Sequence, residues 1–310
     1  MTEEKEGLER RELLRCMAWA GTGVLLTVNS GIPGSIGLEQ AIARPALTGF
    51  SFAQISDSHI GFNKPPNPDA RATFAEAIAK IKALPVKPDF LIHTGDVSQL
   101  SRDNEFDDAN EMLRETGVPT FFVPGEHDVL DEGQGAAFLS RFSPKSNGKG
   151  WYSFDHKGVH FVGLVNVVDL KPGGMGSLGP KQLAWLRRDL HGLSSSTPIV
   201  VFAHMPLLTI YQPWGWGTDD SEQALKMLRR FGSVTILNGH IHQITQKIEG
   251  HIAFHTARST AFPQPAPGAA PSPGPLQVPA DHLREMLGIT SASVTSGRSA
   301  LALLDSTLSN

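Results

Sequence analysis

The sequence contains a single cysteine, Cys16, so no disulfide can form within the chain. It also lacks an excess of positive charge, because 27 lysines and arginines stand against 31 aspartates and glutamates. The net charge is −4 and the pI is about 6.3. Such a chain offers no basic surface that could displace counterions from a polyanion, so we expect no nucleic-acid partner. We expect a small-molecule substrate and, at 310 residues, one large catalytic domain.

A long apolar run is missing as well. The mildly apolar stretch Cys16 to Val28 is too short to cross a bilayer, so we expect no stable membrane anchor. Paired arginines, Arg10 and Arg11, precede it, and Ala41-Ile42-Ala43 supplies a small-residue cleavage pattern. This arrangement resembles a twin-arginine export signal, which makes residues 1–43 a leader and the protein periplasmic or otherwise exported. The alternative is an amphipathic N-terminal helix in a cytoplasmic protein.

Five short apolar runs share one feature: each ends in acidic or histidine side chains. The runs begin at Phe52, Phe90, Thr120, Ile199 and Val234, and they lead to Asp57-Ser58-His59, Gly95-Asp96, Gly125-Glu126-His127-Asp128, His204 and His240-Ile241-His242. A run of this length that ends near a turn indicates a buried strand. If these strands lie in one sheet, their carboxyl ends gather carboxylates and imidazoles, which are ligands for two borderline divalent metals. In extended backbone, residues two apart point the same way, so we expect Asp57 and His59 to chelate one ion.

The segments between these runs predict the fold class. Helical spacing over residues 69–83 and 104–115 places helices between strands, which is typical of a parallel sheet covered on both faces. Residues 151–155 and 159–167 predict a hairpin, which begins a second sheet. Residues 245–249 and 253–256 predict another hairpin. We therefore expect an α/β protein, a four-layer αββα sandwich of two mixed β-sheets flanked by helices.

The predicted domain occupies residues 44–262, and residues 263–310 are a Pro-rich connection and a C-terminal extension of the same domain. Within the extension we expect a short helix near 283–287 and a final strand near 299–304. The extension receives no functional assignment. The sequence predicts no oligomeric state.

Taken together, the ordered motifs resemble those of the calcineurin-like metallophosphoesterase superfamily. Gln54-Ile55-Ser56-Asp57, His93-Thr94-Gly95-Asp96 and Asn238-Gly239-His240-Ile241-His242-Gln243 resemble most the bacterial class III cyclic-nucleotide phosphodiesterase branch. The resemblance implies two divalent or mixed-valence metal ions, and carboxylate with imidazole suits Fe, Mn or Zn. By the same resemblance, Asp57, His59 and His242 hold one ion, His204 and His240 hold the other, and Asp96 bridges both.

The resemblance also implies a reaction. A hydroxide that bridges the two ions attacks phosphorus in line, and the ions neutralise charge on the phosphoryl oxygens. His127 is then expected to bind a phosphoryl oxygen or to protonate the leaving group, while Asp128 holds its imidazole in the useful tautomer. Alternatively, His127 is a loop histidine that caps backbone carbonyls. We expect hydrolysis of phosphodiesters ahead of phosphomonoesters, and a phosphomonoesterase is the alternative.

Glu126 departs from the superfamily, which normally has asparagine at this position. As a ligand of the second ion, an extra carboxylate lowers the net positive charge of the centre and favours a harder or more highly charged ion. Metal binding then tightens while turnover falls, and one alternative is a metal- or phosphate-binding protein with little turnover. Two more alternatives stay open: Glu126 turns away from the site, or it marks a branch with its own substrate.

Aromatic residues in the segment from Met205 to Trp216 are candidates to contact the substrate, because this segment directly follows His204. Equally, these rings pack the loop onto the domain. The glycine-rich segment from Leu170 to Gly179 is a second candidate for the rim of the site, with a plain surface connection as the alternative.

Overall fold

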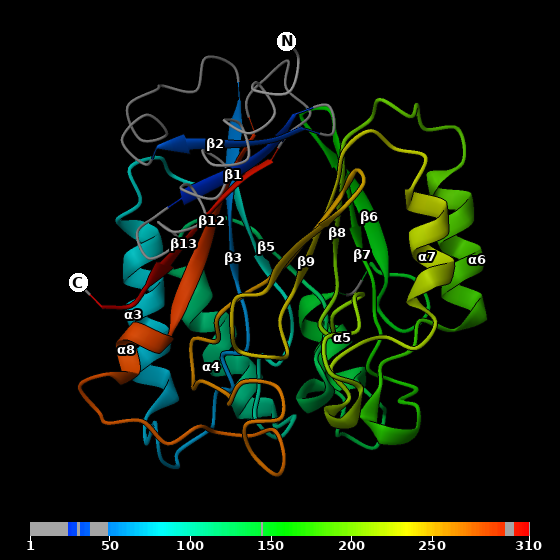
Figure 1. The fold of residues 1–310 in the computed structure, drawn as a ribbon. Coiled ribbons are helices and arrows are strands. Elements are labelled where there is room, and N and C mark those ends of the chain that lie inside the picture. Colours follow the sequence, from blue (N-terminus) through cyan, green and yellow to red (C-terminus); the bar gives the residue numbers. More distant parts are fainter. Residues whose placement is uncertain (1–23, 30–31, 38–48, 144, 295–300, 310) are drawn as a thin grey trace.

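The computed structural model describes residues 24–29, 32–37, 49–143, 145–294 and 301–309, and it contains two β-sheets packed between helices (Figure 1). The first sheet has seven strands in the order β2-β1-β13-β12-β3-β4-β5. They are β1 (Val24–Asn29), β2 (Ile32–Gly37), β3 (Phe50–Ile55), β4 (Phe90–His93), β5 (Thr120–Phe122), β12 (Gly288–Val294) and β13 (Leu301–Thr307). β3, β4 and β5 are parallel, whereas β12 is antiparallel to both of its neighbours.

The second sheet has six strands in the order β10-β11-β9-β8-β7-β6. They are β6 (Tyr152–His156), β7 (Val159–Gly163), β8 (Ile199–Phe202), β9 (Val234–Asn238), β10 (Gln246–Glu249) and β11 (Ile252–Thr256). β7, β8, β9 and β11 are parallel, and the two hairpins add an antiparallel strand at each edge. Both sheets are therefore mixed.

Helices cover the outer face of each sheet, as Figure 1 shows. On the first sheet lie α3 (Ala70–Lys82), α4 (Asp103–Arg114), α5 (Ala136–Phe142) and α8 (Leu283–Met286), and on the second lie α6 (Gly179–Leu190) and α7 (Ser221–Leu228). Three short 3₁₀ turns, η1 (Glu126–Asp128), η2 (Pro172–Gly174) and η3 (Gln212–Trp214), lie in the connections. The predicted αββα sandwich of two mixed sheets is confirmed.

Aromatic side chains fill the space between the two sheets. Phe52 and Phe90 from the first sheet stack with their ring centroids 5.2 Å apart, and Phe161 from the second sheet meets both of them edge-on. Edge-to-face contacts of this kind hold two rings in a fixed relative position in addition to burying apolar area. The aromatic layer therefore fixes one sheet relative to the other, and with it the strand ends of both.

The carboxyl ends of four strands meet at one edge of this sandwich. β3, β4, β8 and β9 end at Ile55, His93, Phe202 and Asn238, and each is followed within two residues by Asp57, Gly95-Asp96, His204 or His240. All four strands are completely buried along this part, so their backbones are held by neighbouring strands on both sides. The loops that follow these four strands therefore start from fixed positions.

The C-terminal extension contributes more strands than expected. The short helix is present as α8, and a strand that the sequence did not indicate, β12, pairs with β3 in the middle of the first sheet. Its sequence, Gly288-Ile289-Thr290-Ser291, has few of the long apolar side chains that mark a buried strand, which is why we did not predict it. The final strand, β13, runs from Leu301 to Thr307 rather than from 299 to 304.

Part of the predicted leader forms strands. Residues 24–29 and 32–37 are β1 and β2, and Leu26 of β1 pairs with Leu303 of β13. The arginine pair and the cleavage pattern at 41–43 lie outside the described residues, so the export signal stays a prediction. Among the described helices, none combines the length and apolar character that crossing a bilayer requires.

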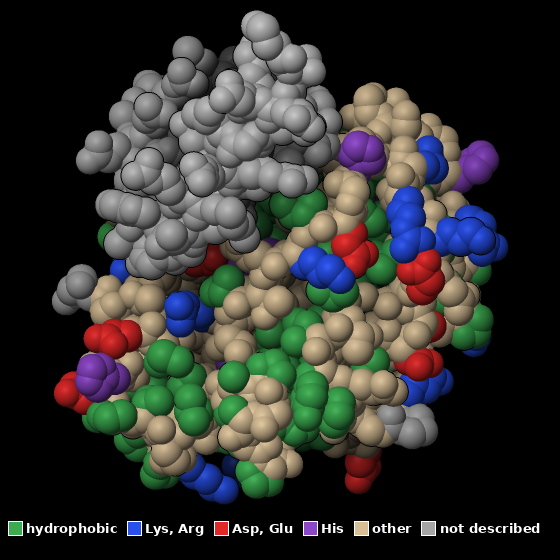
Figure 2. Space-filling model, viewed as in Figure 1, with side chains coloured by type: hydrophobic (Ala, Val, Ile, Leu, Met, Phe, Trp, Pro, Cys, Tyr) green, Lys and Arg blue, Asp and Glu red, His purple; other side chains and the backbone are tan. Residues whose placement is uncertain are grey.

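The surface in Figure 2 mixes both signs of charge. Blue and red side chains alternate over the right and lower parts of this face, and hydrophobic side chains gather at its lower centre. Figure 1 places there the Pro- and Ala-rich connection between β11 and α8.

Candidate metal centre

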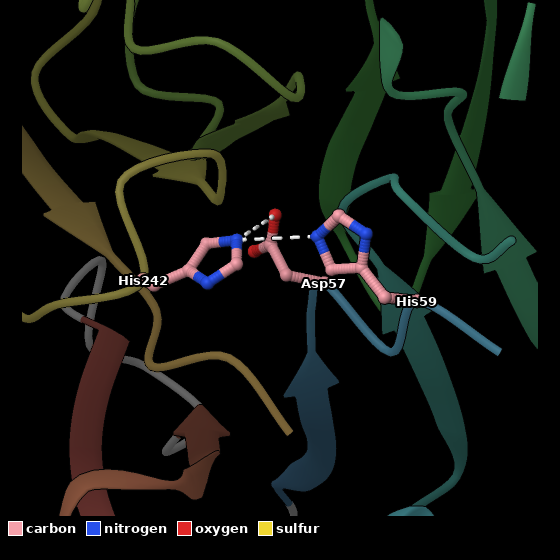
Figure 3. Close-up of side chains that lie close together, drawn as sticks. All are labelled: Asp57, His59 and His242. Atoms are coloured by element: carbon pink, nitrogen blue, oxygen red, sulfur yellow. Dashed lines mark hydrogen bonds and ion pairs between the residues drawn. The ribbon is translucent and has the colours of Figure 1, made fainter. Parts of the chain in front are cut away.

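The first group of candidate ligands comes from both sheets. Asp57 and His59 follow β3, and His242 follows β9 (Figure 3). The Nε2 atom of His242 lies 3.3 Å from Oδ1 of Asp57 and 3.3 Å from Nε2 of His59. All three side chains are buried, and one ligand atom from each falls within 4.8 Å of the others. This spacing is compatible with one metal ion between them.

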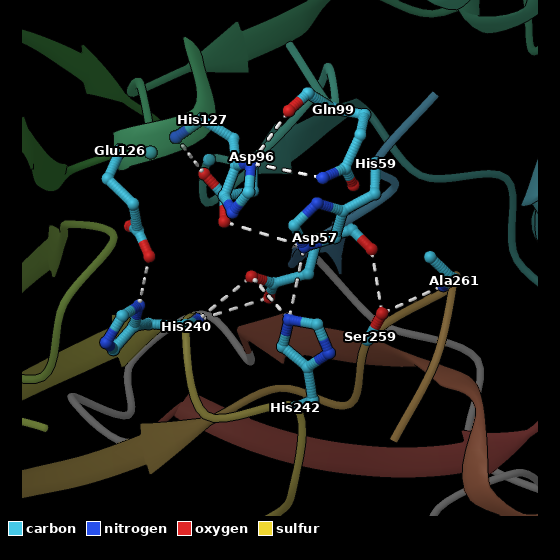
Figure 4. A network of polar contacts seen from close by, with 12 residues as sticks. Asp57, His59, Asp96, Gln99, Glu126, His127, His240, His242, Ser259 and Ala261 are labelled. Atoms are coloured by element: carbon cyan, nitrogen blue, oxygen red, sulfur yellow. Dashed lines mark hydrogen bonds and ion pairs between the residues drawn. The ribbon is translucent and has the colours of Figure 1, made fainter. Parts of the chain in front are cut away.

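The second group lies beside the first. Oε2 of Glu126 is 2.8 Å from Nε2 of His204, and Oε1 of Glu126 is 3.0 Å from Nδ1 of His240. His204 and His240 follow the second-sheet strands β8 and β9, while Glu126 comes from the turn η1 that follows β5 of the first sheet. Figure 4 shows the Glu126 side chain directed toward His240. Glu126 therefore points into the site, and the alternative that it turns away is wrong.

Asp96 lies between the two groups. Its Oδ2 atom is 3.5 Å from Nε2 of His59 in the first group and 3.4 Å from Nε2 of His204 in the second. Its other oxygen, Oδ1, accepts a hydrogen bond from the backbone N–H of His127 at 2.9 Å, which fixes the carboxylate in this orientation (Figure 4). One carboxylate oxygen thus faces both groups, as a bridging ligand does.

Several buried polar atoms in this cluster have no hydrogen-bond partner, although other polar atoms lie close by. They are Nδ1 of His59, Oε2 of Glu126, Nε2 of His204, and both ring nitrogens of His240. A buried polar atom without a partner costs about 1–3 kcal/mol. A cation that accepts lone pairs from Oε2 of Glu126, Nε2 of His204 and one ring nitrogen of His240 removes part of that cost, so the residues present fit a metal ion.

Backbone carbonyls set which nitrogen of each imidazole faces the cluster. Nδ1 of His204 lies 2.7 Å from the carbonyl oxygen of Thr94, and Nδ1 of His242 lies 2.5 Å from that of Phe262. Each Nδ1–H donates to its carbonyl, which leaves the Nε2 lone pair directed at the cluster. Hydrogen bonds of this kind fix the tautomer and the ring orientation of metal-binding histidines.

The protonation states of His59 and Asp57 also suit metal binding. Burial lowers the pKa of His59 to about 3, so its imidazole is neutral. Burial by itself raises the pKa of Asp57, but the imidazoles of His242, His204 and His59 outweigh burial and lower it. A neutral imidazole and an ionised carboxylate are the forms that bind metals.

The sequence profile of the calcineurin-like phosphoesterase family matches residues 50–244, which include every candidate ligand. The chain belongs to the calcineurin-like phosphoesterase family. The resemblance that the motifs indicated is therefore confirmed, and with it the assignment to a family of hydrolases that act on phosphate esters.

Several relatives of this phosphoesterase carry phosphodiesterase names. A probable cyclic nucleotide phosphodiesterase of Psychrobacter sp. (strain PRwf-1) is 25% identical over 200 residues, which are 62% of this chain and 57% of that protein. A glycerophosphodiester phosphodiesterase of Enterobacter lignolyticus is 27% identical over 212 residues, which are 62% of this chain and 71% of that protein. The match thus spans less than two-thirds of the first relative. These names support the bacterial class III branch that the motifs indicated.

The fold of this phosphoesterase is also that of known enzymes. A dimetal phosphatase from Danio rerio superimposes with a TM-score of 0.62 at 14% identity, over 86% of this chain and 99% of that one. At this identity the comparison concerns the fold alone.

The loops of the phosphoesterase site adopt a backbone that sequence reasoning did not foresee. Five of its residues have left-handed backbones with φ between 40° and 70°, namely Asp57, His59, Asp96, His240 and His242. Our expectation that Asp57 and His59 point the same way in an extended strand is therefore wrong. β3 ends at Ile55, and a left-handed turn brings the two side chains together. Such backbones cost about 1–3 kcal/mol each and cluster at functional sites.

The expected contact between Asp128 and the His127 imidazole is also wrong. Asp128 is buried and accepts hydrogen bonds from the backbone N–H groups of Val97, Ser98 and Gly125 at 2.8–3.0 Å. It therefore ties the loop after β4 to the loop after β5. Burial, with a contribution from the Asp96 carboxylate, raises the pKa of Asp128 to about 7.

The imidazole of His127 is held by another residue. Its Nδ1 atom lies 2.7 Å from the carbonyl oxygen of Gln99, and its ring centroid is 4.8 Å from that of His59. Burial lowers the pKa of His127, but the carboxylates of Asp96 and Glu126 outweigh it and raise the pKa. His127 thus lies beside the cluster, with one ring nitrogen within 4.8 Å of ligand atoms of His59 and Asp96. The side-chain Nε2 of Gln99 also lies 3.4 Å from Nδ1 of His127, and no sequence motif indicated either contact with Gln99.

The segment after β11 supports the site, although the sequence analysis gave it no role. Ser259 Oγ donates to the carbonyl oxygen of Asp57 at 2.7 Å, and the ring of Phe262 lies 4.8 Å from His59 and 4.6 Å from His242 between centroids. Gln264 donates to the carbonyl oxygen of His240 at 3.0 Å. Ser259 and Asp57 are 202 positions apart in the chain, so local patterns did not indicate such contacts.

For the aromatic rings in the segment from Met205 to Trp216, the structure favours packing onto the domain over contact with the substrate. Trp216 is fully buried, with 0% of its surface exposed, and its ring lies edge-on to Trp214 at 5.0 Å. Leu170, from the second candidate rim, lines the same cavity as Glu126 and His127.

Glycines allow the loops to approach one another, and Gly125 lies at one of the closest approaches. A Cβ atom at Gly125 would overlap both Oδ1 and the backbone nitrogen of Asp96. We predict that Gly125→Ala separates Glu126 from Asp96 and lowers the bound metal per chain at least several-fold, as measured by elemental analysis after metal loading and dialysis.

The matched control is Gly232→Ala, whose Cβ meets only the carbonyl oxygen of Ser195, at 3.7 Å. Its metal content should equal that of the unmodified protein. Equal metal content in Gly125→Ala and Gly232→Ala would show that the close approach of the two loops is unnecessary.

Proposed function

We propose that this protein is a binuclear metal-dependent phosphodiesterase that acts on small-molecule phosphate esters. The observation that carries the proposal is the position of Asp96, whose Oδ2 atom faces both ligand groups within 3.5 Å. The phosphodiesterase names of the relatives favour diesters over monoesters.

The residues are arranged to hold two cations. Asp57, His59 and His242 would bind one, Glu126, His204 and His240 would bind the other, and Asp96 would contact both. Nitrogen and oxygen donors of this kind suit Fe, Mn or Zn. When bound, two such ions supply positive charge that lowers the pKa of water and neutralises phosphoryl oxygens.

His127 is the residue proposed to act on the substrate. Because its Nδ1–H is held by Gln99, its Nε2 atom is available to bind a phosphoryl oxygen or to donate a proton to the leaving-group oxygen. The buried carboxylate of Asp128 accepts hydrogen bonds from three backbone N–H groups, which lie in the loops after β4 and β5. Its role is therefore to position the loop that carries His127.

The proposal is tested with two substrates on the metal-loaded protein, bis(p-nitrophenyl) phosphate and p-nitrophenyl phosphate. We predict a higher kcat/KM for the diester, and we predict that Asp96→Asn abolishes both activities because it removes a charged ligand common to both groups. Elemental analysis of Asp96→Asn should show loss of metal. A strong preference for the monoester would favour the phosphomonoesterase alternative instead.

A second prediction concerns His127. In His127→Gln, we expect kcat/KM for a diester with an alkyl leaving group to fall by about 10²–10⁴-fold, since an alkoxide needs a proton to leave. For p-nitrophenolate, a stable anion, the loss should be far smaller. An equal loss for both leaving groups would assign His127 to binding the phosphoryl group rather than to proton donation.

A metal- or phosphate-binding protein with little turnover is the second candidate function, and Glu126 is the observation that favours it. Its two oxygens lie against His204 and His240 at 2.8 and 3.0 Å, so the centre contains three carboxylates with Asp57 and Asp96. An additional anion binds cations more tightly and reduces the positive charge available to the phosphoryl group.

Glu126→Asn separates the two functions. If the protein is an enzyme, we predict weaker metal binding in Glu126→Asn and substantial hydrolysis by the unmodified protein. Glu132→Asn, an exposed position in the same loop, is the control and should change neither property. If the unmodified protein holds two ions without cleaving any ester, and Glu126→Asn gains hydrolysis, the binding function is correct.

A further inference from the structure

A cavity of about 420 Å³ opens beside Glu126 and His127. Apart from these two residues and Gln134, its lining is aliphatic, and it comprises Val129, Leu130, Val167, Val168 and Leu170. A volume of this size accommodates a small organic group, within the range of ligand sites in proteins. Because His127 belongs both to the lining and to the surroundings of the metal centre, a group in the cavity adjoins the proposed reaction site.

The inner wall of the cavity is held in place by the protein core. Val129 and Val168 pack against a buried cluster of Val165, Val167 and Met205. Met205 directly follows His204, so this cluster joins the wall to a candidate metal ligand. The wall is therefore a built surface that lies in a fixed position relative to the site.

The rim of the cavity is formed by exposed leucines. Leu130 is 57% exposed and Leu170 is 45% exposed, and among the described residues few large aliphatic side chains are as exposed as these two. Single apolar side chains are common on protein surfaces, but two that flank one apolar cavity form a patch. An apolar ligand between them would cover this surface.

The cavity has little to offer a polar ligand. In the part of the chain that the structure describes, its lining contains no lysine or arginine, and Gln134 is its one neutral side chain with hydrogen-bonding groups. A nucleobase or a glycerol group would find polar side-chain partners only in Glu126, His127 and Gln134, and it would gain little from contact with the valines and leucines. An alkyl or aryl group has no donors or acceptors to satisfy.

We infer that the substrate is a phosphodiester whose leaving group is apolar, and that this alkyl or aryl group occupies the cavity with its ester oxygen next to His127. The inference rests on the proposed phosphodiesterase function. In the reaction, water adds to phosphorus, the bond from phosphorus to the ester oxygen breaks, and the alcohol leaves with a proton. The products are a phosphomonoester and an apolar alcohol.

The test uses three methyl phosphodiesters that differ only in the second alcohol, which is ethanol, hexanol or glycerol. All release methyl phosphate, so ³¹P NMR follows the same product throughout. We expect kcat/KM for the hexyl ester to exceed that for the ethyl ester by about 10- to 100-fold, because four additional methylenes become buried. We expect the glycerol ester and a cyclic nucleotide to be poorer substrates than the hexyl ester.

Substitutions of the two leucines at the rim test the inference. In Leu130→Asn/Leu170→Asn, the ratio of kcat/KM between hexyl and ethyl esters should fall to a few-fold. Val86→Asn, an equally exposed aliphatic position at 59% that lies outside the cavity, should leave the ratio unchanged. A ratio that is the same in the double variant as in the unmodified protein would overturn the inference.

Binding is measured separately from turnover, by calorimetric titration with hexyl and ethyl methylphosphonate on the metal-loaded protein. Tighter binding of the hexyl compound, with a more negative heat-capacity change, supports an apolar site. If every diester is cleaved but the hexyl group gives no advantage in rate or binding, the inference fails and the proposed function stands. If no ester is cleaved while the hexyl compound binds more tightly, the proposed function fails and the apolar site stands.

Discussion

The balance of charge around one buried carboxylate governs this structure. Asp96 lies between two groups of imidazoles, with two further carboxylates, Asp57 and Glu126, on either side. Burying three anions is costly unless each is paired, and here histidines compensate them only in part, because several ring nitrogens and one carboxylate oxygen have no hydrogen-bond partner. Cations between the ligands would complete the pairing. The same cations would supply the chemistry of the proposed function. The need for electrostatic balance and the proposed function therefore have the same physical cause, which is the set of buried carboxylates.

The loops that carry the ligands store conformational strain, and the rest of the fold holds them in place. Left-handed backbones at Asp57, Asp96 and His240, among others, persist because each lies at the end of a fully buried strand. Asp128 ties two of the loops together through backbone hydrogen bonds. Ser259 holds a third, and the aromatic layer between the sheets sets the distance between their strand ends. Packing at a distance from the site thus stabilises the strained backbone of the ligand loops.

Glu126 and the apolar cavity meet on one side of this site. Glu126 contributes an anion to the second ligand group, and the turn that carries it also forms one side of the cavity with Val129 and Leu130. One short segment therefore affects both the charge of the centre and the character of the group that can approach it. His127 lies between these two features, held by Gln99, where a leaving group would pass.

The sequence by itself determined the strands that lead to the site and the identity of the candidate ligands, because apolar runs that end in Asp, Glu or His are local patterns with a direct physical meaning. It also placed Glu126 among the candidate ligands, and the structure brings this side chain against His204 and His240. Only the tertiary structure decided how the ligands meet: the left-handed turn at Asp57 and His59, the real partners of Asp128 and His127, and the support from the segment after β11. It also decided that β12 joins the first sheet and that leucines border the site. These features depend on backbone groups and on contacts between residues far apart in the chain, and neither leaves a periodic or compositional trace in the amino-acid sequence.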